Sequence, residues 1–225
     1  MATTYVVTAC NRGLGLEFAR QLSNRGDRVI ATARDLENAT ELAALDVETF
    51  ALDVADAASV ERFGEAMAGV SIDVLLNNAG VGVRSKPFES LDFAEMEEFF
   101  AINTVGALRV FRVLLPGLRA GSGKKVVNMT SRMGSIGDNT SGAAYSYRAS
   151  KAALNMATRS LAVDYRAEGF ICVVLHPGWV VTDMGGAGAP VKPEDSIFGL
   201  LRVIDGLQAS DSGEHIDFTG TRVPW

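Results

Sequence analysis

The fold of this chain is decided by the stretch Thr4-Tyr5-Val6-Val7-Thr8-Ala9-Cys10-Asn11-Arg12-Gly13-Leu14-Gly15. Its first six residues form a β-branched run typical of a strand, and an amphipathic helical stretch runs from the glycines to Arg25. Gly13 and Gly15 allow close backbone approach, and the helix N-terminus behind them offers unpaired N–H groups and a positive dipole end to a pyrophosphate. The stretch therefore predicts a strand, a phosphate-binding turn and a helix.

Outward from this stretch, predicted strands and helices alternate along the whole chain. The further strands are expected at Arg28–Ala33, Val47–Leu52, Asp73–Leu76, Lys125–Thr130, Ile171–Leu175 and Ile216–Phe218. The further helices are expected at Leu36–Leu45, Ala57–Ala68, Phe93–Leu115, Tyr147–Glu168 and Glu194–Leu207. A βαβαβ order is typical of a parallel sheet with helices on both faces, in which a nucleotide lies across the carboxyl ends of the strands.

Composition limits the domain count and the partners. With 225 residues, of which 48% are hydrophobic and 21% charged, the chain can bury the core of a single domain spanning residues 1–225. A net charge of −6 without a basic cluster argues against a nucleic-acid or anionic-membrane surface, so a small-molecule partner is expected. No apolar run approaches the roughly 20 residues that span a bilayer, and we expect a soluble, cytoplasmic protein. Cys10 and Cys172 are expected to be small buried residues, with neither a disulfide nor a metal site.

Tyr147 and Lys151 are the candidates for acid–base chemistry. Residues four apart share one face of a helix, so both side chains can point into the same pocket. A phenol has a reference pKa of about 10, and a nearby cation brings that pKa towards the working range. Tyr145 lies six residues from Lys151 and is expected to point away from it. Alone, the pair is also consistent with an ordinary helix.

Further candidates are Asn103, the stretch 77–80 and Ser131. Asn103 lies in the apolar run 99–105 and needs hydrogen-bond partners, so its role is either structural or catalytic. The stretch 77–80, Asn-Asn-Ala-Gly, follows a predicted strand, where asparagine side chains usually fix a turn. Ser131 comes at the end of the predicted strand Lys125–Thr130.

The chain resembles a short-chain dehydrogenase/reductase with a seven-stranded Rossmann sheet. The features that carry this resemblance are, in chain order, the glycine turn, Asn77-Asn78-Ala79-Gly80, Ser131, Tyr147-x-x-x-Lys151 and Pro177-Gly178. The resemblance covers essentially the whole chain. The narrower likeness is to the carbonyl-reductase-like branch of the sniffer and C-factor type. The segments that carry this narrower likeness are Asn128-Met129-Thr130-Ser131-Arg132-Met133-Gly134-Ser135-Ile136, Tyr147-Arg148-Ala149-Ser150-Lys151 and Val223-Pro224-Trp225.

The resemblance implies a role for each catalytic candidate. Tyr147 is expected to protonate a substrate carbonyl oxygen or to deprotonate an alcohol, and Ser131 to hydrogen-bond the same oxygen. Lys151 is expected to lower the Tyr147 pKa and to bind the nicotinamide ribose, and Asn103 to hold a water that relays protons to Lys151. The residues implied in cofactor binding are Arg12, Gly13, Leu14, Gly15, Arg34, Asp53, Val54, Asn77, Ala79, Gly80, Tyr147, Lys151, Pro177, Gly178, Val180 and Thr182.

The second predicted strand indicates which cofactor is used. Folds specific for NAD place an acidic residue at the end of this strand, whereas here Ala33 is followed by Arg34, with Arg12 in the glycine turn. Guanidinium groups match a phosphate, so NADP(H) is the expected cofactor. Two readings stay open, because Asp35 could act as a displaced ribose ligand and the arginines could simply lie on the surface.

Two departures from the family pattern stand out. The phosphate turn of the family usually begins with glycine where this chain has Ala9, and a methyl group is tolerated there if φ is negative. The separation of Ser131 from Tyr147 is a few residues longer than usual, which leaves Ser135 as an alternative hydroxyl. An insertion in the Gly/Ser-rich loop accounts for the difference.

The sequence thus predicts an NADP(H)-dependent ketone or aldehyde reductase or alcohol dehydrogenase, with a cofactor-binding regulatory protein of little turnover as the alternative. A homodimer, or a tetramer of dimers, is also expected, because residues 152–163 leave little polar face on the helix after Lys151. The alternative is that the loop before Tyr147 covers this helix.

Overall fold

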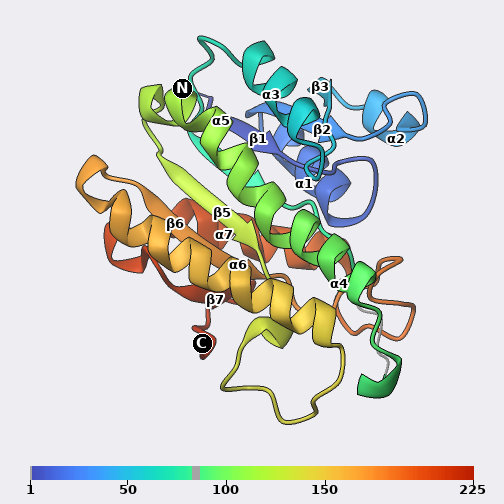
Figure 1. Cartoon of the computed structure of the whole chain (residues 1–225). Helices are drawn as coiled ribbons and strands as arrows, with labels where there is room; N and C mark the ends of the chain where they lie inside the picture. The colour runs from blue at the N-terminus through green and yellow to red at the C-terminus, as the bar shows by residue number, and fades with distance from the viewer. Residues whose placement is uncertain (1, 83–86) are drawn as a thin grey trace.

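A single parallel sheet organises the protein, and the computed structural model describes it over residues 2–82 and 87–225. The strand order is β3-β2-β1-β4-β5-β6-β7, which confirms the expected seven-stranded, doubly wound α/β fold (Figure 1). The strands are β1 (Thr4–Val7), β2 (Arg28–Ala33), β3 (Glu48–Ala51), β4 (Val74–Asn77), β5 (Lys125–Met129), β6 (Ile171–His176) and β7 (His215–Asp217).

The strand order reverses at β1, which pairs with β2 on one side and β4 on the other. In open α/β sheets a ligand lies in the crevice outside the carboxyl ends of the strands at such a switch point. The glycine turn after β1 and the Asn-Asn-Ala-Gly stretch after β4 both lie at this point. The fold therefore brings two segments that are about 65 residues apart in the sequence to one crevice.

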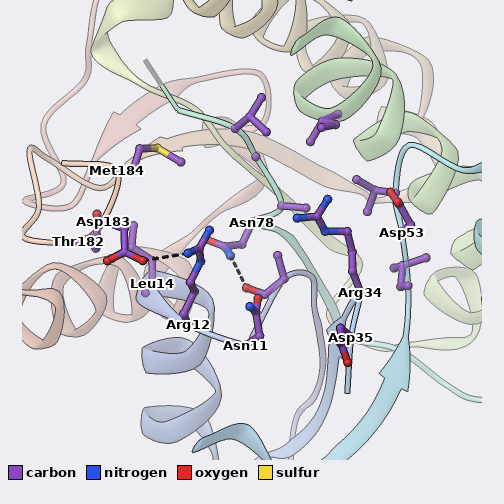
Figure 2. Close-up of a pocket in the computed structure, with 18 residues that line it drawn as sticks. Asn11, Arg12, Leu14, Arg34, Asp35, Asp53, Asn78, Thr182, Asp183 and Met184 are labelled. Atoms are coloured by element: carbon purple, nitrogen blue, oxygen red, sulfur yellow. Dashed lines mark hydrogen bonds and ion pairs between the residues drawn. The ribbon is translucent and has the colours of Figure 1, made fainter. Parts of the chain in front are cut away.

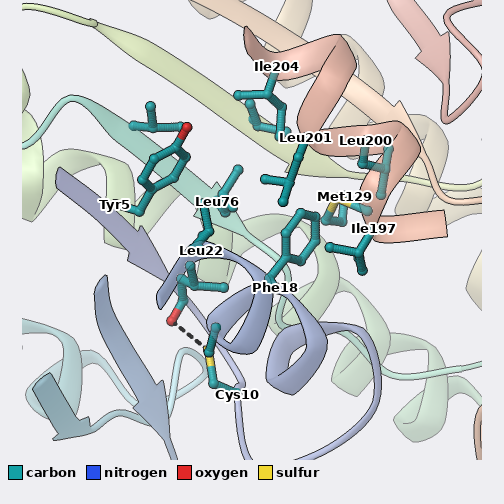
Figure 3. Close-up of a cluster of buried hydrophobic side chains, with 14 of the residues drawn as sticks. Tyr5, Cys10, Phe18, Leu22, Leu76, Met129, Ile197, Leu200, Leu201 and Ile204 are labelled. Carbon is teal, nitrogen blue, oxygen red and sulfur yellow. Dashed lines mark hydrogen bonds between the residues drawn. The ribbon is translucent and has the colours of Figure 1, made fainter. Parts of the chain in front are cut away.

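Helices cover both faces of the sheet because strand residues alternate between two apolar layers. Val74 and Leu76 belong to one buried cluster, and Leu75 belongs to the other. The first layer lies under α1 (Gly13–Asn24) and α7 (Pro193–Gly206), where Phe18 and Leu200 meet the sheet (Figure 3). The second layer lies under α3 (Ala57–Ala66), α5 (Ala107–Ala120) and α6 (Tyr145–Asp164).

Three helices differ from the sequence prediction. In place of a helix over Leu36–Leu45, the chain forms only α2 (Thr40–Ala43), because the Asp35 carboxylate accepts hydrogen bonds from the Glu37 and Asn38 backbone N–H groups and holds a turn there. Helix α6 begins two residues early and ends at Asp164, before a separate short turn at Arg166–Glu168. The helix that begins at Phe93 runs to Ala120 as α4 (Phe93–Phe100), a π-helical segment (Ala101–Gly106) and α5.

The stretch Phe93–Ala120 is long and apolar enough to cross a membrane by length and composition alone, so the expectation that no apolar run approaches that length is wrong. In this fold Phe99, Phe111 and Leu114 on the same stretch are buried. The fold buries 44% of the most apolar 18-residue segment of this stretch inside the protein.

Both cysteines are buried, as expected for small core residues. Burial raises the pKa of each thiol to about 12, which keeps both protonated at neutral pH. The Cys10 Sγ donates to the Val7 carbonyl at 3.2 Å, so it also closes the first residues of the glycine turn onto β1 (Figure 3).

Candidate active site

A cavity of about 290 Å³ lies at the switch point of the sheet (Figure 2). Its walls come from the turns that follow β1, β2, β3, β4 and β6. The lining residues are Ala9, Asn11, Arg12, Gly13, Leu14, Arg34, Asp35, Leu52, Asp53, Val54, Asn78, Ala79, Gly80, Val81, Ile102, Thr182, Asp183 and Met184. The cavity thus joins most of the residues implied in cofactor binding.

The glycine turn at the base of the cavity is closely packed. Gly13 has φ +57°, which a residue without Cβ adopts freely, and Gly15 lies behind the turn, where a Cβ would stand 2.0 Å from the Ala9 carbonyl oxygen. No side chain caps the N-terminus of α1. Its first N–H groups therefore remain available to an anion, and with the dipole end of the helix they fit a pyrophosphate.

Ala9 has φ +59°, so the condition under which its methyl group was expected to be tolerated is not met. The turn keeps the left-handed backbone that a glycine adopts without strain, and Ala9 holds it at a cost of about 1–2 kcal/mol. The surrounding contacts stabilise this conformation. The Asn78 side chain donates to the carbonyls of Thr8 and Ala9, at 3.0 and 3.3 Å.

The far end of the cavity carries charged side chains. Arg34 is exposed, and in the described part of the chain it forms no ion pair. The Asp35 carboxylate accepts from the Asn38 side chain at 2.5 Å as well as from the backbone, and these hydrogen bonds hold its pKa below the usual range. On the next turn, Asp53 accepts from the Ala55 N–H at 2.9 Å.

Near the opposite end, an ion pair connects two turns that are far apart in the sequence. Arg12 Nη1 lies 3.0 Å from Asp183 Oδ2, and the two side chains are 70% and 78% exposed (Figure 2). Met184 lies against the segment that follows β4, since a Cβ on Gly82 would stand 2.4 Å from Met184 Cγ.

The catalytic candidates lie together on the buried face of α6. Tyr147 is 7% and Lys151 5% exposed, and the Lys151 Nζ lies 5.9 Å from the centre of the Tyr147 ring. The Nζ donates to the Met129 carbonyl at 2.8 Å, so the lysine reaches under the end of β5, and the Ser131 side chain is near enough to lower the pKa of Tyr147. Three candidate residues from two segments therefore meet.

Burial controls the ionisation of this cluster. Desolvation raises the pKa of Tyr147, and the Ser131 side chain lowers it by less. Desolvation also lowers the pKa of Lys151 to about 8. Burial is therefore the largest cause for both groups, and it holds the tyrosine in its protonated form. A lowering of the Tyr147 pKa by Lys151 stays a prediction.

Asn103 lies in the π-helical segment and is 1% exposed. Its Oδ1 accepts from the Val81 N–H at 2.9 Å, and its Nδ2 donates to Val81 O at 3.3 Å and to Ser150 Oγ at 3.0 Å. A Cβ on Gly80 would stand 3.0 Å from Asn103 Oδ1 and 3.4 Å from Lys151 Nζ. Gly80 thus marks the point where the cavity meets the catalytic cluster.

A family model described as short chain dehydrogenase matches residues 3–190, a range that includes both the glycine turn and the Tyr147 cluster. The chain belongs to the short-chain dehydrogenase family. It is 54% identical over 154 residues to the C-signal of Myxococcus xanthus, which covers 68% of this chain and 93% of that protein. It is also similar to two solved structures over its whole length.

One of these structures is the carbonyl reductase Sniffer of D. melanogaster, with a TM-score of 0.94 and 32% identity, covering 100% of each chain. The other is an NADPH-bound carbonyl reductase from chicken fatty liver, with a TM-score of 0.92 and 35% identity, covering 100% of this chain and 99% of that one. These comparisons support the carbonyl-reductase-like branch.

Some residues that the resemblance implies in this short-chain dehydrogenase do not line the cavity. Asn77 is buried beneath it, where its Nδ2 donates to Asn128 Oδ1 at 2.8 Å, and the neighbouring Asn78 takes the lining position. The Pro177 carbonyl accepts from Ser196 Oγ on α7, and a Cβ on Gly178 would stand 2.9 Å from the Phe218 ring. The other residues outside the lining are Gly15, Tyr147, Lys151 and Val180.

The sequence prediction missed Asn11, Leu52, Asn78, Val81, Ile102, Asp183 and Met184 among the lining residues. Ser135, the alternative hydroxyl, is 1% exposed, and its Oγ accepts from the Asp138 N–H. Tyr145 points away from the Lys151 face, as expected, and packs edge-on against Phe88 at 5.3 Å between ring centres. Ser131, whose side chain acts on the pKa of Tyr147, is therefore the better candidate hydroxyl than Ser135.

Proposed function

We propose that this short-chain dehydrogenase is an NADP(H)-dependent oxidoreductase that transfers hydride between nicotinamide and the carbonyl or alcohol carbon of a ketone, aldehyde or alcohol. One observation carries the proposal. Tyr147, whose pKa the Ser131 side chain lowers, shares a buried helix face with Lys151 beside Gly80, where the nucleotide cavity ends. The proton-transfer groups thus lie at the end of the cavity at which a nicotinamide ring would react.

The residues present fit a dinucleotide. The uncapped N-terminus of α1 and the close packing of Gly15 fit the pyrophosphate, and Asp53 and Val54 line the place of the adenine. Thr182 lies at the nicotinamide end. When bound, the cofactor supplies or accepts the hydride.

The chain's own residues manage the proton. The raised pKa keeps Tyr147 protonated, so it can donate to the oxygen of a carbonyl substrate during reduction. The Ser131 hydroxyl, which also acts on the pKa of Tyr147, orients that oxygen and stabilises its developing charge. Lys151, with a pKa near 8, stays mostly cationic at neutral pH and stabilises the tyrosinate that forms. Asn103 fixes the Val81 backbone beside them.

The preference for NADP(H) is supported by the charged end of the cavity. Arg34 has no ion-pair partner among the described residues, whereas Asp35 is engaged by its own turn and is poorly placed as a ribose ligand. A 2′-phosphate on the adenosine ribose would give the free guanidinium a partner.

The test is a panel of aldehydes, ketones, quinones and secondary alcohols, assayed with NADPH, NADH and their oxidised forms. We expect carbonyl reduction with NADPH, which is measured as the loss of absorbance at the nicotinamide band. Absence of turnover with every compound and both cofactors would contradict the proposal.

A second candidate function is favoured by the likeness to the C-signal: a regulatory protein that binds the cofactor and turns over little. A variant that lacks turnover but binds NADPH separates the two functions. If the cellular role of the chain survives in Tyr147→Phe, signalling without catalysis is the better account. If the cellular role is lost together with turnover, the enzymatic function is the better account.

We further propose that the protein is a homodimer, or a tetramer of such dimers, through the outer face of α6. Met156 and Val163 on this face are 68% and 59% exposed. The loop before the helix is fixed to its first turns by Arg148, which donates to the carbonyls of Gly142 and Met133, so it leaves those two side chains uncovered. Sedimentation at micromolar concentration tests this, and a mass near the 23.9 kDa of one chain would contradict it.

A further inference from the structure

Asn155 connects the catalytic helix to both sides of Ser131. Its Oδ1 accepts from Thr130 Oγ1 at 2.6 Å, and its Nδ2 donates to the Gly134 carbonyl at 3.2 Å. Thr130 precedes Ser131 directly, and Gly134 closes the short turn that Ser131 begins, since its N–H donates to Ser131 O at 2.8 Å. One amide thus holds the chain on either side of the serine.

The same amide lies in register with the proton-transfer residues. Asn155 follows Lys151 by four residues and Tyr147 by eight, so all three project from one face of α6. It is 3% exposed, and both ends of its amide are hydrogen-bonded, which fixes the side chain without help from solvent. A shift of Asn155 therefore moves Ser131 relative to Tyr147.

Gly134 makes the contact close. A Cβ at this position would stand 2.9 Å from Lys151 Cβ and 3.2 Å from Asn155 Nδ2. The turn that carries Ser131 thus lies directly on the backbone of the catalytic helix. This tight contact is needed because the long loop between Ser131 and Tyr147 cannot by itself fix their separation.

We propose that Asn155 is a positioning residue, which together with Gly134 sets the place of the Ser131 hydroxyl against Tyr147. The proposal rests on the proposed reductase function. Asn155 acts through Ser131 and touches neither substrate nor cofactor. Its loss should misplace the serine, and small displacements of catalytic groups lower rates by roughly 10- to 100-fold.

The chain offers a matched control one turn further along α6. Asn128 Nδ2 donates to Thr158 Oγ1 at 2.7 Å, which is a second buried amide–hydroxyl contact between β5 and the same helix. It lies away from Ser131. Asn155→Leu and Thr158→Val each remove one such contact with little change in shape, so both should lower stability, while only the first should lower kcat.

A double-mutant cycle with Ser131→Ala gives the decisive result. We expect Asn155→Leu to lower kcat roughly tenfold or more in the wild-type background, with unchanged NADPH affinity, and to have no further effect on the residual rate of Ser131→Ala. An equal loss in both backgrounds, or an equal loss from Thr158→Val, would overturn the proposal.

A second pair of variants covers the case in which Asn155→Leu does not fold. Gly134→Ala crowds the same contact, and Gly64→Ala crowds a remote one, where a Cβ would stand 2.7 Å from Val113 Cβ. We expect only Gly134→Ala to lower kcat. Similar rates in both variants would overturn the inference.

Hydrogen exchange separates this inference from the proposed function. If the wild type reduces no carbonyl, the proposed function is wrong, and the amides of residues 131–135 still report the positioning role. Faster exchange of these amides in Asn155→Leu than in Thr158→Val supports the role, and equal exchange overturns it.

Discussion

The candidate cofactor cavity and the Tyr147 cluster meet at Gly80 but are built in opposite ways. The cavity is formed by backbone turns and exposed charged side chains, such as Arg12 and Arg34. The cluster is formed by side chains that are almost fully buried, with Lys151 and Asn103 at 5% and 1% exposure. A cofactor bound in the cavity would therefore be held by many weak, screened contacts. Proton transfer in the cluster would instead depend on a few desolvated groups.

This difference predicts graded effects across the two regions. Removing a buried group from the cluster should lower turnover the most, because no neighbouring group can replace it. Removing an exposed charge from the cavity should only shift the cofactor preference, and a change in the backbone of the cavity wall should alter stability slightly.

Tyr147→Phe removes the proposed proton donor and little else. The Phe99 ring packs edge-on against the Tyr147 ring at 6.4 Å between ring centres, and phenylalanine keeps that contact. We expect kcat to fall by roughly 10²-fold or more, the scale of general acid–base catalysis, and Lys151→Ala to do the same. Steady-state kinetics measure the loss, with NADPH binding by fluorescence as the control for folding. Rates near those of the wild type would contradict the mechanism.

The pH profile of reduction tests the charge on Lys151. Its pKa is lowered to about 8, so the cation is lost as pH rises through that value. We expect kcat/KM to fall above about pH 8, approaching a tenfold loss per pH unit. Lys125 is a matched control, because burial also lowers its pKa but its Nζ donates to the Ile204 carbonyl, on α7. Lys125→Met should leave the alkaline limb in place, and a profile flat to pH 10 would contradict the prediction.

The lowered pKa of Lys151 also determines whether the free energy of unfolding rises or falls with pH. The folded-state pKa of Lys151 lies below the value of 10.5 that is normal for the unfolded chain, so the unfolded state binds more protons between about pH 8 and 10.5. The penalty for burying the cation is therefore full below pH 8 and is relieved as pH rises through this window. Urea unfolding at pH 8 and 10 should show this gain in the wild type and not in Lys151→Met.

Arg34→Ala tests the exposed end of the cavity. If this guanidinium binds a 2′-phosphate, its loss should lower kcat/KM for NADPH about tenfold, or about 1.4 kcal/mol, and leave NADH unchanged. Arg112→Ala is the control, since Arg112 is similarly exposed but pairs with Glu61 outside the cavity. Equal use of NADH and NADPH by the wild type would contradict the assignment.

The sequence predicted well what depends on local pattern. The alternation of strands and helices gave the sheet, and the four-residue spacing placed Tyr147 and Lys151 on one face of α6. It failed where tertiary contacts decide. Neighbouring strand residues point to opposite faces, so choosing between Asn77 and Asn78 required knowledge of which face packs on α5.

Other misses share the same cause. Asp183 and Met184 lie in an irregular loop without periodicity, and their place beside the glycine turn depends on contacts that span more than 100 residues. The pKa of Tyr147 moved against expectation because sequence spacing reveals the cation but not the depth of burial. The π-helical segment around Asn103 likewise has no signal in local propensity.

The smallest predicted effect concerns backbone strain in the cavity. Ala9→Gly removes a methyl group from a residue with φ +59°, which should relieve about 1–2 kcal/mol of strain. The added freedom of glycine in the unfolded chain opposes this by about 0.4–1 kcal/mol. The relief of strain exceeds this entropic cost, so we expect a net stabilisation of about 0.5–1 kcal/mol.

Urea unfolding of Ala9→Gly beside Ala66→Gly measures this balance. Ala66 is exposed at the end of α3, where glycine relieves no strain and should cost about 0.5–1 kcal/mol. Opposite signs for the two variants would show that the cavity wall holds strain at Ala9. Destabilisation of both variants would show that the turn accommodates the methyl group of Ala9 without strain. The backbone of the cavity wall would then be unstrained, and its charged side chains would still be exposed.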